Sequence, residues 1–242
     1  MHTSPAASPP RPPRSRAAVR AAWILAAFSA ALLLLVAAEW RPLIVLDGDI
    51  SRTTHRWAVE EEGITRAFRI LTDWVWDPWT MRLLCAAVAL WLGLRHAAWW
   101  TAGWLAAACV LGSVLQQALK AAVGRPRPVW PDPVDSAHYA AFPSGHAMTA
   151  ALVSGLLLWL LHRHRAARAV RLAALTAAVV SVAGVGLTRV WLGVHWPSDV
   201  VGGWLLGGLV VAVAVPLHRR GRTQAPPAAR NEELPSQRDP AP

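Results

Sequence analysis

Six long apolar segments constrain the fold of this 242-residue chain more than any other feature. A helix needs about 20 mostly apolar residues to cross the hydrocarbon core of a bilayer, and several of the segments approach that length. They cover residues 21–38, 79–94, 97–119, 146–161, 170–187 and 200–217. We therefore expect an all-α fold, an integral membrane bundle of six transmembrane helices. The second segment is the weakest, because Arg82 interrupts it.

Polar sequence flanks the apolar region on both sides. We expect residues 1–18 to form a disordered basic tail and residues 218–242 a second disordered tail, with a six-helix domain over 19–217 between them. A cleaved signal peptide is the competing interpretation of residues 21–38. Because that segment exceeds the usual signal core of about 7–15 apolar residues, a retained transmembrane helix is favoured.

The formal net charge of +10 is divided unevenly between the two sides of such a bundle. With six spans and both termini on one side, that side carries +11 and the other carries −1. Cytoplasmic loops are enriched in Lys and Arg, so the basic side, with both termini, is predicted to be cytoplasmic. The charge thus sets the orientation of a multi-pass protein in the cell membrane, and no nucleic-acid partner is expected.

The longest loop on the outer side covers residues 39–78. Residues 53–71 within it have a mixed helical pattern of apolar and charged positions, which predicts a surface helix. Whether this loop gates a site on the outer side is not defined by the pattern.

Ser144-Gly145-His146 joins a polar loop to the fourth apolar segment. Ser144 is a favourable N-cap, and Gly145 lets backbone N–H groups come close to a ligand. A helix N-terminus offers unpaired donors and the positive end of a dipole, which suits an anion. His146 adds a side chain that can carry a proton near neutral pH. Alone, this tripeptide usually marks an ordinary helix cap, so its meaning depends on the residues that accompany it.

Fixed cations reach the same outer side when the six spans alternate in direction. Lys120 and Arg127 follow the third span, and Arg189 follows the fifth. Three cations and a helix N-terminus together suit the oxygens of a phosphate. Singly, each cation is explained by a side chain that extends to the lipid headgroups, but that explanation does not account for all of them on one side.

A histidine and a carboxylate lie between the fifth and sixth spans, on that same side. Pro197 favours a helix start, and Asp199 in the first turn can reach back to the His195 ring. Such a bond would fix the tautomer and leave the other ring nitrogen free to attack phosphorus. His146 would then protonate the leaving oxygen.

Three ordered motifs summarise these residues: Lys120-(six residues)-Arg127-Pro128, Pro143-Ser144-Gly145-His146 and Arg189-(five residues)-His195-(three residues)-Asp199. This pattern resembles the signature of the type 2 phosphatidic acid phosphatase superfamily, also called lipid phosphate phosphatases and related to vanadium haloperoxidases. One departure is Thr188, where the family usually has Ser. Arg125 lies off the family's fixed positions and is left out of the predicted site.

The resemblance implies a role for each matched residue. His195 would be the nucleophile that forms a phosphohistidine, Asp199 would orient it, and His146 would be the general acid. The implied phosphate ligands are Lys120, Arg127, Ser144, Gly145 and Arg189. No metal and no other cofactor is implied. His162 and His164 resemble a metal-binding pair only in spacing, since they lie in a basic loop without a carboxylate.

The function that follows is a metal-independent membrane hydrolase that removes phosphate from a lipid phosphate or diphosphate. Phosphatidic acid, phosphatidylglycerol phosphate, diacylglycerol pyrophosphate and a polyprenyl diphosphate all fit, and the pattern selects neither one of them nor an oligomeric state. An anionic-lipid transporter could use the same cations, but it needs no nucleophilic histidine. A vanadate-dependent oxidase shares the motifs, but six spans count against it.

Overall fold

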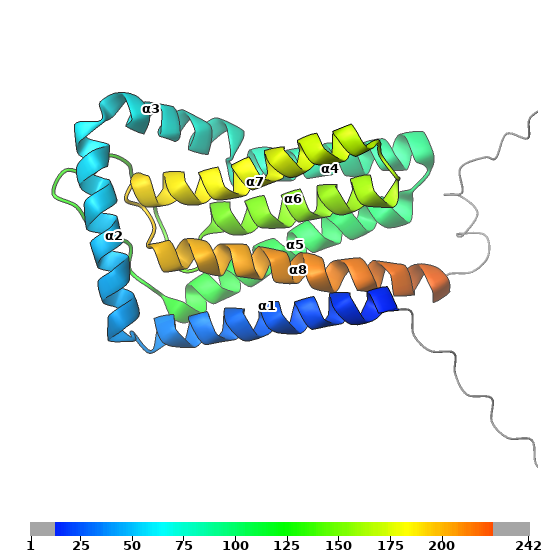
Figure 1. The fold of residues 1–242 in the computed structure, drawn as a ribbon, viewed down its shortest axis with the longest axis horizontal. Helices are drawn as coiled ribbons and strands as arrows, with labels where there is room; N and C mark the ends of the chain where they lie inside the picture. Colours follow the sequence, from blue (N-terminus) through cyan, green and yellow to red (C-terminus); the bar gives the residue numbers. More distant parts are fainter. Residues whose placement is uncertain (1–12, 225–242) are drawn as a thin grey trace, which may run out of the picture.

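Residues 13–224, which the computed structural model describes, are mostly helical and contain no strand. The all-α prediction is confirmed for this part of the chain. Six long helices lie side by side (Figure 1): α1 (Pro13–Ala37), α4 (Pro78–His96), α5 (Trp99–Val123), α6 (Gly145–Arg163), α7 (Arg168–Trp191) and α8 (Pro197–Gln224). Three further elements connect α1 to α4: α2 (Arg41–Glu60), α3 (Glu62–Ile70) and the π-helical turn η1 (Leu71–Val75).

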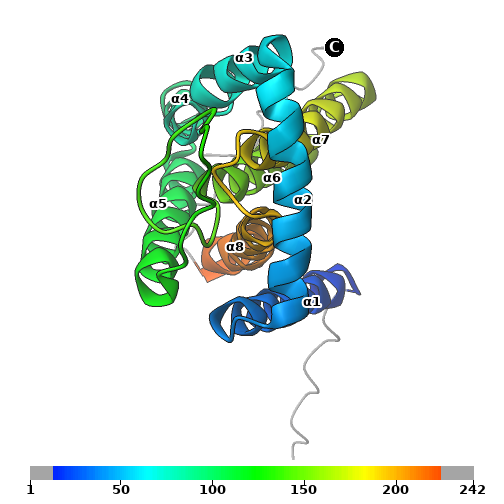
Figure 2. The same ribbon diagram turned by 90° about the vertical axis from the view of Figure 1, so that its left-hand side faces the viewer.

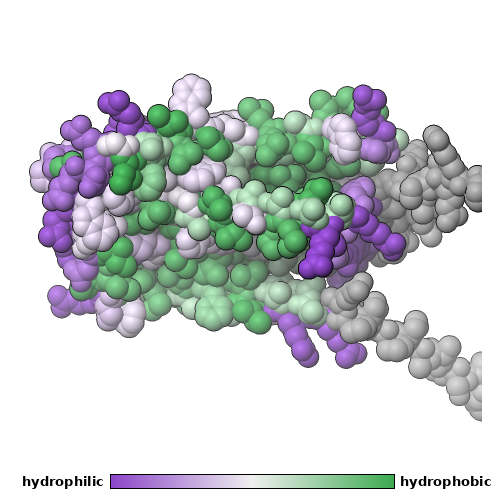
Figure 3. Space-filling view, turned by 45° about the horizontal axis from the view of Figure 1, so that its top comes forward, coloured by the Kyte–Doolittle hydropathy of each residue, from purple (hydrophilic) through white to green (hydrophobic). Residues whose placement is uncertain are grey.

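Five of the six long helices are long and apolar enough to cross a membrane. These segments are Arg16–Ala37, Trp99–Val123, Gly145–Arg163, Arg168–Trp191 and Pro197–Gly221. The exception is α4, which forms where the second apolar segment was predicted but carries Arg82 and Arg95 within its 19 residues. On the face that Figure 3 shows, apolar residues cover the middle of the bundle, and hydrophilic residues gather toward its ends.

Helix α6 lies at the centre of the bundle and carries buried side chains along most of its length. It packs most closely against α8, where two glycines one turn apart permit the contact. A Cβ atom at Gly203 would lie 2.7 Å from the carbonyl oxygen of Ser144, and one at Gly207 would lie 2.5 Å from that of Met148. Only a residue without a side chain lets the two backbones approach this closely.

Helix α2 crosses one end of the bundle at a steep angle to the long helices (Figure 2). Its buried residues are Asp47, Gly48, Ser51, His55 and Ala58, which share one face at helical spacing. The single surface helix predicted at 53–71 is therefore replaced by two helices and a π-helical turn. The polar face of α2 is directed toward the bundle, where the candidate site lies.

The helices extend further than the expected domain boundaries of 19 and 217. Helix α1 begins at Pro13, and α8 continues to Gln224. Proline is tolerated in the first turn of a helix, and arginines at the end of α8 are compatible with the negative end of its dipole. Residues 13–18 and 218–224 are thus helical rather than part of the two tails. The rest of both predicted tails lies outside the described residues.

Candidate active site

The three motifs meet at the end of the bundle that α2 crosses. A cavity of about 290 Å³ lies there, lined by α4, α5, the start of α6, the end of α7 and the loop over residues 124–144. Six of the eight predicted site residues line it: Lys120, Arg127, Gly145, His146, Arg189 and His195. The other two lie directly behind its wall, since Ser144 precedes Gly145 and Asp199 contacts His195. The fold therefore brings all eight residues together.

Ser144 occupies the N-cap position of α6, next to this cavity. The predicted N-cap position is confirmed, but the side chain makes no capping hydrogen bond. Its backbone N–H instead donates to the carbonyl of Asp199 at 3.0 Å, which ties the start of α6 to α8. Among the described residues its buried Oγ has no hydrogen-bond partner. Because an unpartnered buried hydroxyl costs free energy, this one suits an oxygen that arrives with a ligand.

Gly145 keeps the N-terminus of α6 accessible. A Cβ atom there would lie 2.6 Å from Nε2 of Gln116, so a larger residue would displace that amide. The first N–H groups of a helix have no intrahelical partner, and both Gly145 and His146 line the cavity. The α6 terminus can therefore donate to an anion there.

Backbone carbonyls hold the two cations that precede α6. Lys120, in the last turn of α5, donates to the carbonyl of Ala140. Arg127 donates to the carbonyl of Tyr139 at 2.9 Å and to that of Val194 at 2.5 Å. Carbonyl partners orient both side chains without neutralising them, so their positive charges remain available to a phosphate.

Arg189 enters the cavity from the last turn of α7 and is buried. Its Nη1 lies 3.9 Å from Oδ2 of Asp135, a long ion pair, and its buried Nε has no partner among the described residues. This guanidinium therefore retains a donor that an additional anion can satisfy.

The hydroxyl of the preceding residue, Thr188, is not directed to this cavity. It donates to the carbonyl of Val185 at 3.0 Å and accepts from the hydroxyl of Thr72 at 2.6 Å. The Thr at the family's Ser position therefore joins α7 to η1, and neither bond involves a residue of the three motifs.

His195 lies in the turn between α7 and α8 and is held at both ring nitrogens. Nδ1 lies 3.3 Å from Oδ2 of Asp199, and Nε2 lies 3.2 Å from Nη1 of Arg127. Because a guanidinium can only donate, Nε2 is the acceptor and Nδ1 carries the proton toward the carboxylate. Helix α8 begins at Pro197, as predicted, and this start places Asp199 one turn from His195. The unprotonated nitrogen of His195 is thus Nε2, and its lone pair accepts from Arg127 on the side of the cations.

The pKa of His195 lies well below its ordinary value of 6.5. Burial is the largest cause, followed by the positive charges of Arg127, Arg189 and Lys120. A neutral imidazole is required of a nucleophile, so these neighbours keep the ring in its reactive form.

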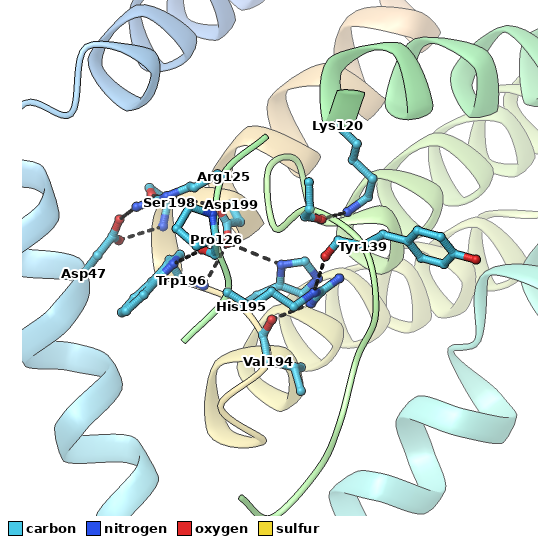
Figure 4. A network of polar contacts seen from close by, with 12 residues as sticks. Asp47, Lys120, Arg125, Pro126, Tyr139, Val194, His195, Trp196, Ser198 and Asp199 are labelled. Atoms are coloured by element: carbon cyan, nitrogen blue, oxygen red, sulfur yellow. Dashed lines mark hydrogen bonds and ion pairs between the residues drawn. The ribbon is translucent and has the colours of Figure 1, made fainter. Parts of the chain in front are cut away.

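A buried ion-pair network supports Asp199 from the side opposite His195. Arg125 Nη1 lies 2.6 Å from Oδ1 of Asp199, and its Nη2 lies 2.7 Å from Oδ2 of Asp47 on α2 (Figure 4). Asp47 also accepts from the backbone N–H of Ser198 at 2.9 Å. One cation between two carboxylates therefore links α2, the loop over residues 124–144 and the start of α8.

Sequence reasoning missed this network. Arg125 does not match a family position, and Asp47 follows the apolar run at 43–46 without any motif. The position of Asp47 directly after an apolar run indicates that its carboxylate is buried. A buried charge needs a partner, so this position predicts a nearby cation. That position does not identify which of the chain's many arginines is the partner.

Taken together, the cavity combines a neutral imidazole with an unprotonated Nε2, a second histidine, the three predicted cations and Arg82, and a helix N-terminus. Such a set can bind a tetrahedral anion, attack its central atom and protonate a departing oxygen. Phosphoryl transfer requires these three operations.

Known proteins resemble this chain in sequence and in fold. The model of the PAP2 superfamily matches residues 98–222. Phosphatidylglycerophosphatase B from Bacillus subtilis is 36% identical over 99 residues, which cover 40% of this chain and 48% of the relative. Decaprenylphosphoryl-5-phosphoribose phosphatase from Mycobacterium tuberculosis is 33% identical over 138 residues, covering 56% of this chain and 68% of the relative. The chain thus spans about half the length of the Bacillus relative.

A solved structure has a similar fold. The crystal structure of a transmembrane PAP2-type phosphatidylglycerolphosphate phosphatase from Bacillus subtilis superimposes with a TM-score of 0.58 at 23% identity. The match covers 81% of this chain and 98% of that one. The arrangement of helices is therefore shared well beyond the three motifs.

Proposed function

The chain belongs to the PAP2 superfamily, and we propose that it is a membrane-embedded phosphatase that acts on lipid phosphates through a phosphohistidine intermediate. The state of His195 carries this proposal: Nδ1 faces Asp199, while Nε2 and its lone pair face the cation of Arg127. A nucleophile with a fixed tautomer thereby lies beside charges that stabilise a transferring phosphoryl group.

In the first half-reaction, Nε2 of His195 attacks the phosphorus atom. An N–P bond forms while the bond from phosphorus to the lipid oxygen breaks, and the electron pair of that bond stays on the oxygen. His146 donates a proton to this oxygen, so that the lipid product does not leave as an alkoxide. Lys120, Arg127 and Arg189 stabilise the charge on the three oxygens that remain on phosphorus.

In the second half-reaction, a water molecule attacks the phosphohistidine. His146, now neutral, accepts a proton from the water. The N–P bond breaks, its electron pair returns to Nε2 of His195, and inorganic phosphate leaves. Asp199 accepts the Nδ1–H bond throughout and stabilises the positive charge of the phosphorylated ring.

The substrate is a lipid monophosphate or diphosphate. Phosphatidic acid, phosphatidylglycerol phosphate, diacylglycerol pyrophosphate and a polyprenyl diphosphate all present a terminal phosphate to the same cations. The names of the two relatives, which refer to a phosphatidylglycerophosphate and to a polyprenyl-linked phosphoribose, support this group of substrates.

In the bilayer, α4 serves as a sixth span and the cavity lies on the outer face. Arg82, which weakens α4 as a span, lines the cavity and does not have to face lipid. The opposite end of the bundle has a pocket lined by one histidine and four arginines, namely His162, Arg163, Arg165, Arg171 and Arg219. This basic end supports a cytoplasmic location for that end and for both termini.

Catalysis proceeds without a divalent metal. Lys120, Arg127 and Arg189 line the same cavity as His195. In many phosphoryl-transfer enzymes magnesium stabilises the negative charge on the phosphate oxygens. Here Lys120, Arg127 and Arg189 stabilise that charge.

The test is release of inorganic phosphate by purified protein from a panel of lipid phosphates and polyprenyl phosphates in detergent micelles. Activity should persist in EDTA and should be inhibited by vanadate, which mimics pentacoordinate phosphorus. No release from any lipid would refute the proposal, and loss in EDTA with recovery in magnesium would refute metal independence.

A further inference from the structure

Arg82 is a charged residue within the apolar part of α4, one turn after the helix begins at Pro78. A cation at this depth of a bilayer is costly and marks a functional position more often than a structural one. The three sequence motifs assign it no role, although it lines the same cavity as His195 and Lys120.

Among the residues that the structure describes, Arg82 contacts only neutral groups, and one of them is the Trp79 ring, whose centroid lies 5.9 Å from the guanidinium carbon. Its Nη2 donates to Oε1 of Gln116 at 3.4 Å and to Oγ1 of Thr149 at 3.2 Å, and both acceptors are neutral. Within the described part of the chain, no carboxylate lies within ion-pair distance of it. Asp77, the acidic residue of the cavity wall, accepts from the backbone of Trp79 at 2.7 Å and caps α4. Because this guanidinium has no ion-pair partner among the described residues, it is available to an anion that enters the cavity.

The two contacts also locate Arg82 relative to the phosphate site. The Gln116 amide that it touches lies against Gly145, where a Cβ atom would be 2.6 Å from Nε2. Thr149 follows Gly145 by four residues on α6, which is about 6 Å deeper along the helix. The guanidinium thus lies beside the phosphate site but further into the apolar part of the bundle.

A lipid substrate must pass this position. Its terminal phosphate binds at the start of α6, and its hydrocarbon tail must extend toward the apolar middle of the bundle. A second anionic group between terminal phosphate and tail would lie at the depth of Arg82, which can bind two phosphate oxygens through its planar fork.

We propose that Arg82 forms a second anion subsite that selects lipids with two phosphate groups, one reacting at His195 and one linking it to the tail. This inference rests on the proposed function and narrows its substrate class. Two kinds of lipid carry both phosphates. In a lipid diphosphate the two phosphates are joined directly, and in phosphatidylglycerol phosphate a glycerol separates the terminal phosphate from the phosphodiester.

The experiment compares kcat/KM for matched substrates in wild-type protein and in Arg82→Gln. One pair is phosphatidylglycerol phosphate and phosphatidic acid, and the other is a polyprenyl diphosphate and its monophosphate. The ratio of two-phosphate to one-phosphate activity should fall about tenfold or more in the variant, equivalent to about 1.4 kcal/mol. The substrate pair whose ratio falls shows whether the preferred lipid joins its two phosphates directly or through glycerol. Arg82→Lys should restore part of that ratio.

Arg95→Gln is the matched control, because Arg95 is an exposed arginine at the other end of the same helix. It should leave both ratios as in the wild type. An equal loss on one-phosphate and two-phosphate lipids in Arg82→Gln, or no change in either ratio, would overturn the inference while the proposed function stands. Wild-type protein that releases no phosphate from any lipid would overturn both. If Arg82→Gln does not fold, the ratio in Arg82→Lys decides, since a lysine cannot form the bidentate contact.

Discussion

The two histidines of the cavity are expected to respond differently to substitution. His195→Ala removes the nucleophile, so it should abolish turnover and any acid-labile phosphoenzyme on every substrate. His146→Ala removes the general acid and should slow lipid hydrolysis by about 10²–10⁴-fold. The loss on an aryl phosphate such as p-nitrophenyl phosphate should be much smaller, because its leaving group needs little protonation. Phosphate release and trapping of the labelled phosphoenzyme measure both effects.

His162→Ala, at the opposite end of the bundle, provides the matched control. It should retain wild-type rates on both substrates. The assignment of roles fails if either cavity variant hydrolyses lipid at nearly the wild-type rate, or if His146→Ala loses lipid and aryl activity equally.

The depressed pKa of His195 predicts the acidic limb of the pH profile. Burial is its main cause, and the charges of Arg127, Arg189 and Lys120 add to it. The neutral ring is the reactive form, so kcat/KM should persist as the pH falls through 6.5 and decline only at lower pH. Arg127→Gln removes one of these charges, so the pKa of His195 should rise and the limb should move to higher pH, in addition to a loss of rate.

The measurement is kcat/KM against pH with one aryl phosphate for both proteins, so that ionisation of the substrate contributes equally. Exposed Arg52→Gln on α2 changes the net charge by the same amount far from the ring and should not move the limb. If kcat/KM declines at the same pH in Arg127→Gln and in the wild type, the charge of Arg127 does not influence the pKa of His195.

At the scale of elements, α2 is joined to the catalytic turn through Arg125. This cation lies between Asp47 of α2 and Asp199 of α8. Arg125→Gln leaves the two carboxylates without their shared cation, so Asp199 should lose its position and His195 its tautomer. Because small displacements in an active site are costly, phosphoenzyme formation should slow by on the order of 10²-fold with little change in KM.

Arg125→Lys tests whether charge alone is sufficient. A lysine cannot bridge two carboxylates in the fixed fork of a guanidinium, so it should recover only part of the rate. Thermal unfolding in detergent reports stability separately. A purely structural role predicts an altered melting temperature with a normal rate at low temperature, and that result would remove Arg125 from the positioning of His195.

The long helices could be predicted from the sequence because apolar length determines them directly. The start of α8 at Pro197 was also predictable from local chemistry, since proline suits the first turn. The path of α2 across the end of the bundle was not predictable. Its buried face is polar, with Asp47, Ser51 and His55, so hydrophobic periodicity gives no orientation for it.

Within the site, too, local sequence determines some residues, and tertiary contacts determine the others. His146, His195 and Asp199 were predictable because short spacings along the chain place them at helix starts. Arg125 and Arg82 were not, because each is defined by partners on other helices. Their roles depend on tertiary contacts that no local pattern encodes.

For the whole molecule, the two ends of the bundle differ in charge and in chemistry. The end crossed by α2 contains the cavity, and the opposite end carries the basic pocket between α6, α7 and α8. Helix ends rich in arginine remain on the cytoplasmic side of a membrane. The cavity should then open to the outer face, where a lipid phosphate can enter from the outer leaflet and inorganic phosphate can leave to water.

Lys120 makes this orientation testable, because it is the chain's single lysine and lines the cavity. A small membrane-impermeant amine reagent applied to intact cells at high pH should modify Lys120, as peptide mass spectrometry would detect. Modification should inactivate the enzyme, since an acylated amine loses the charge that pairs with phosphate. Vanadate or inorganic phosphate should slow the labelling by occupying the site. Labelling that requires broken cells would invert the topology, and full activity after complete labelling would exclude Lys120 from phosphate binding.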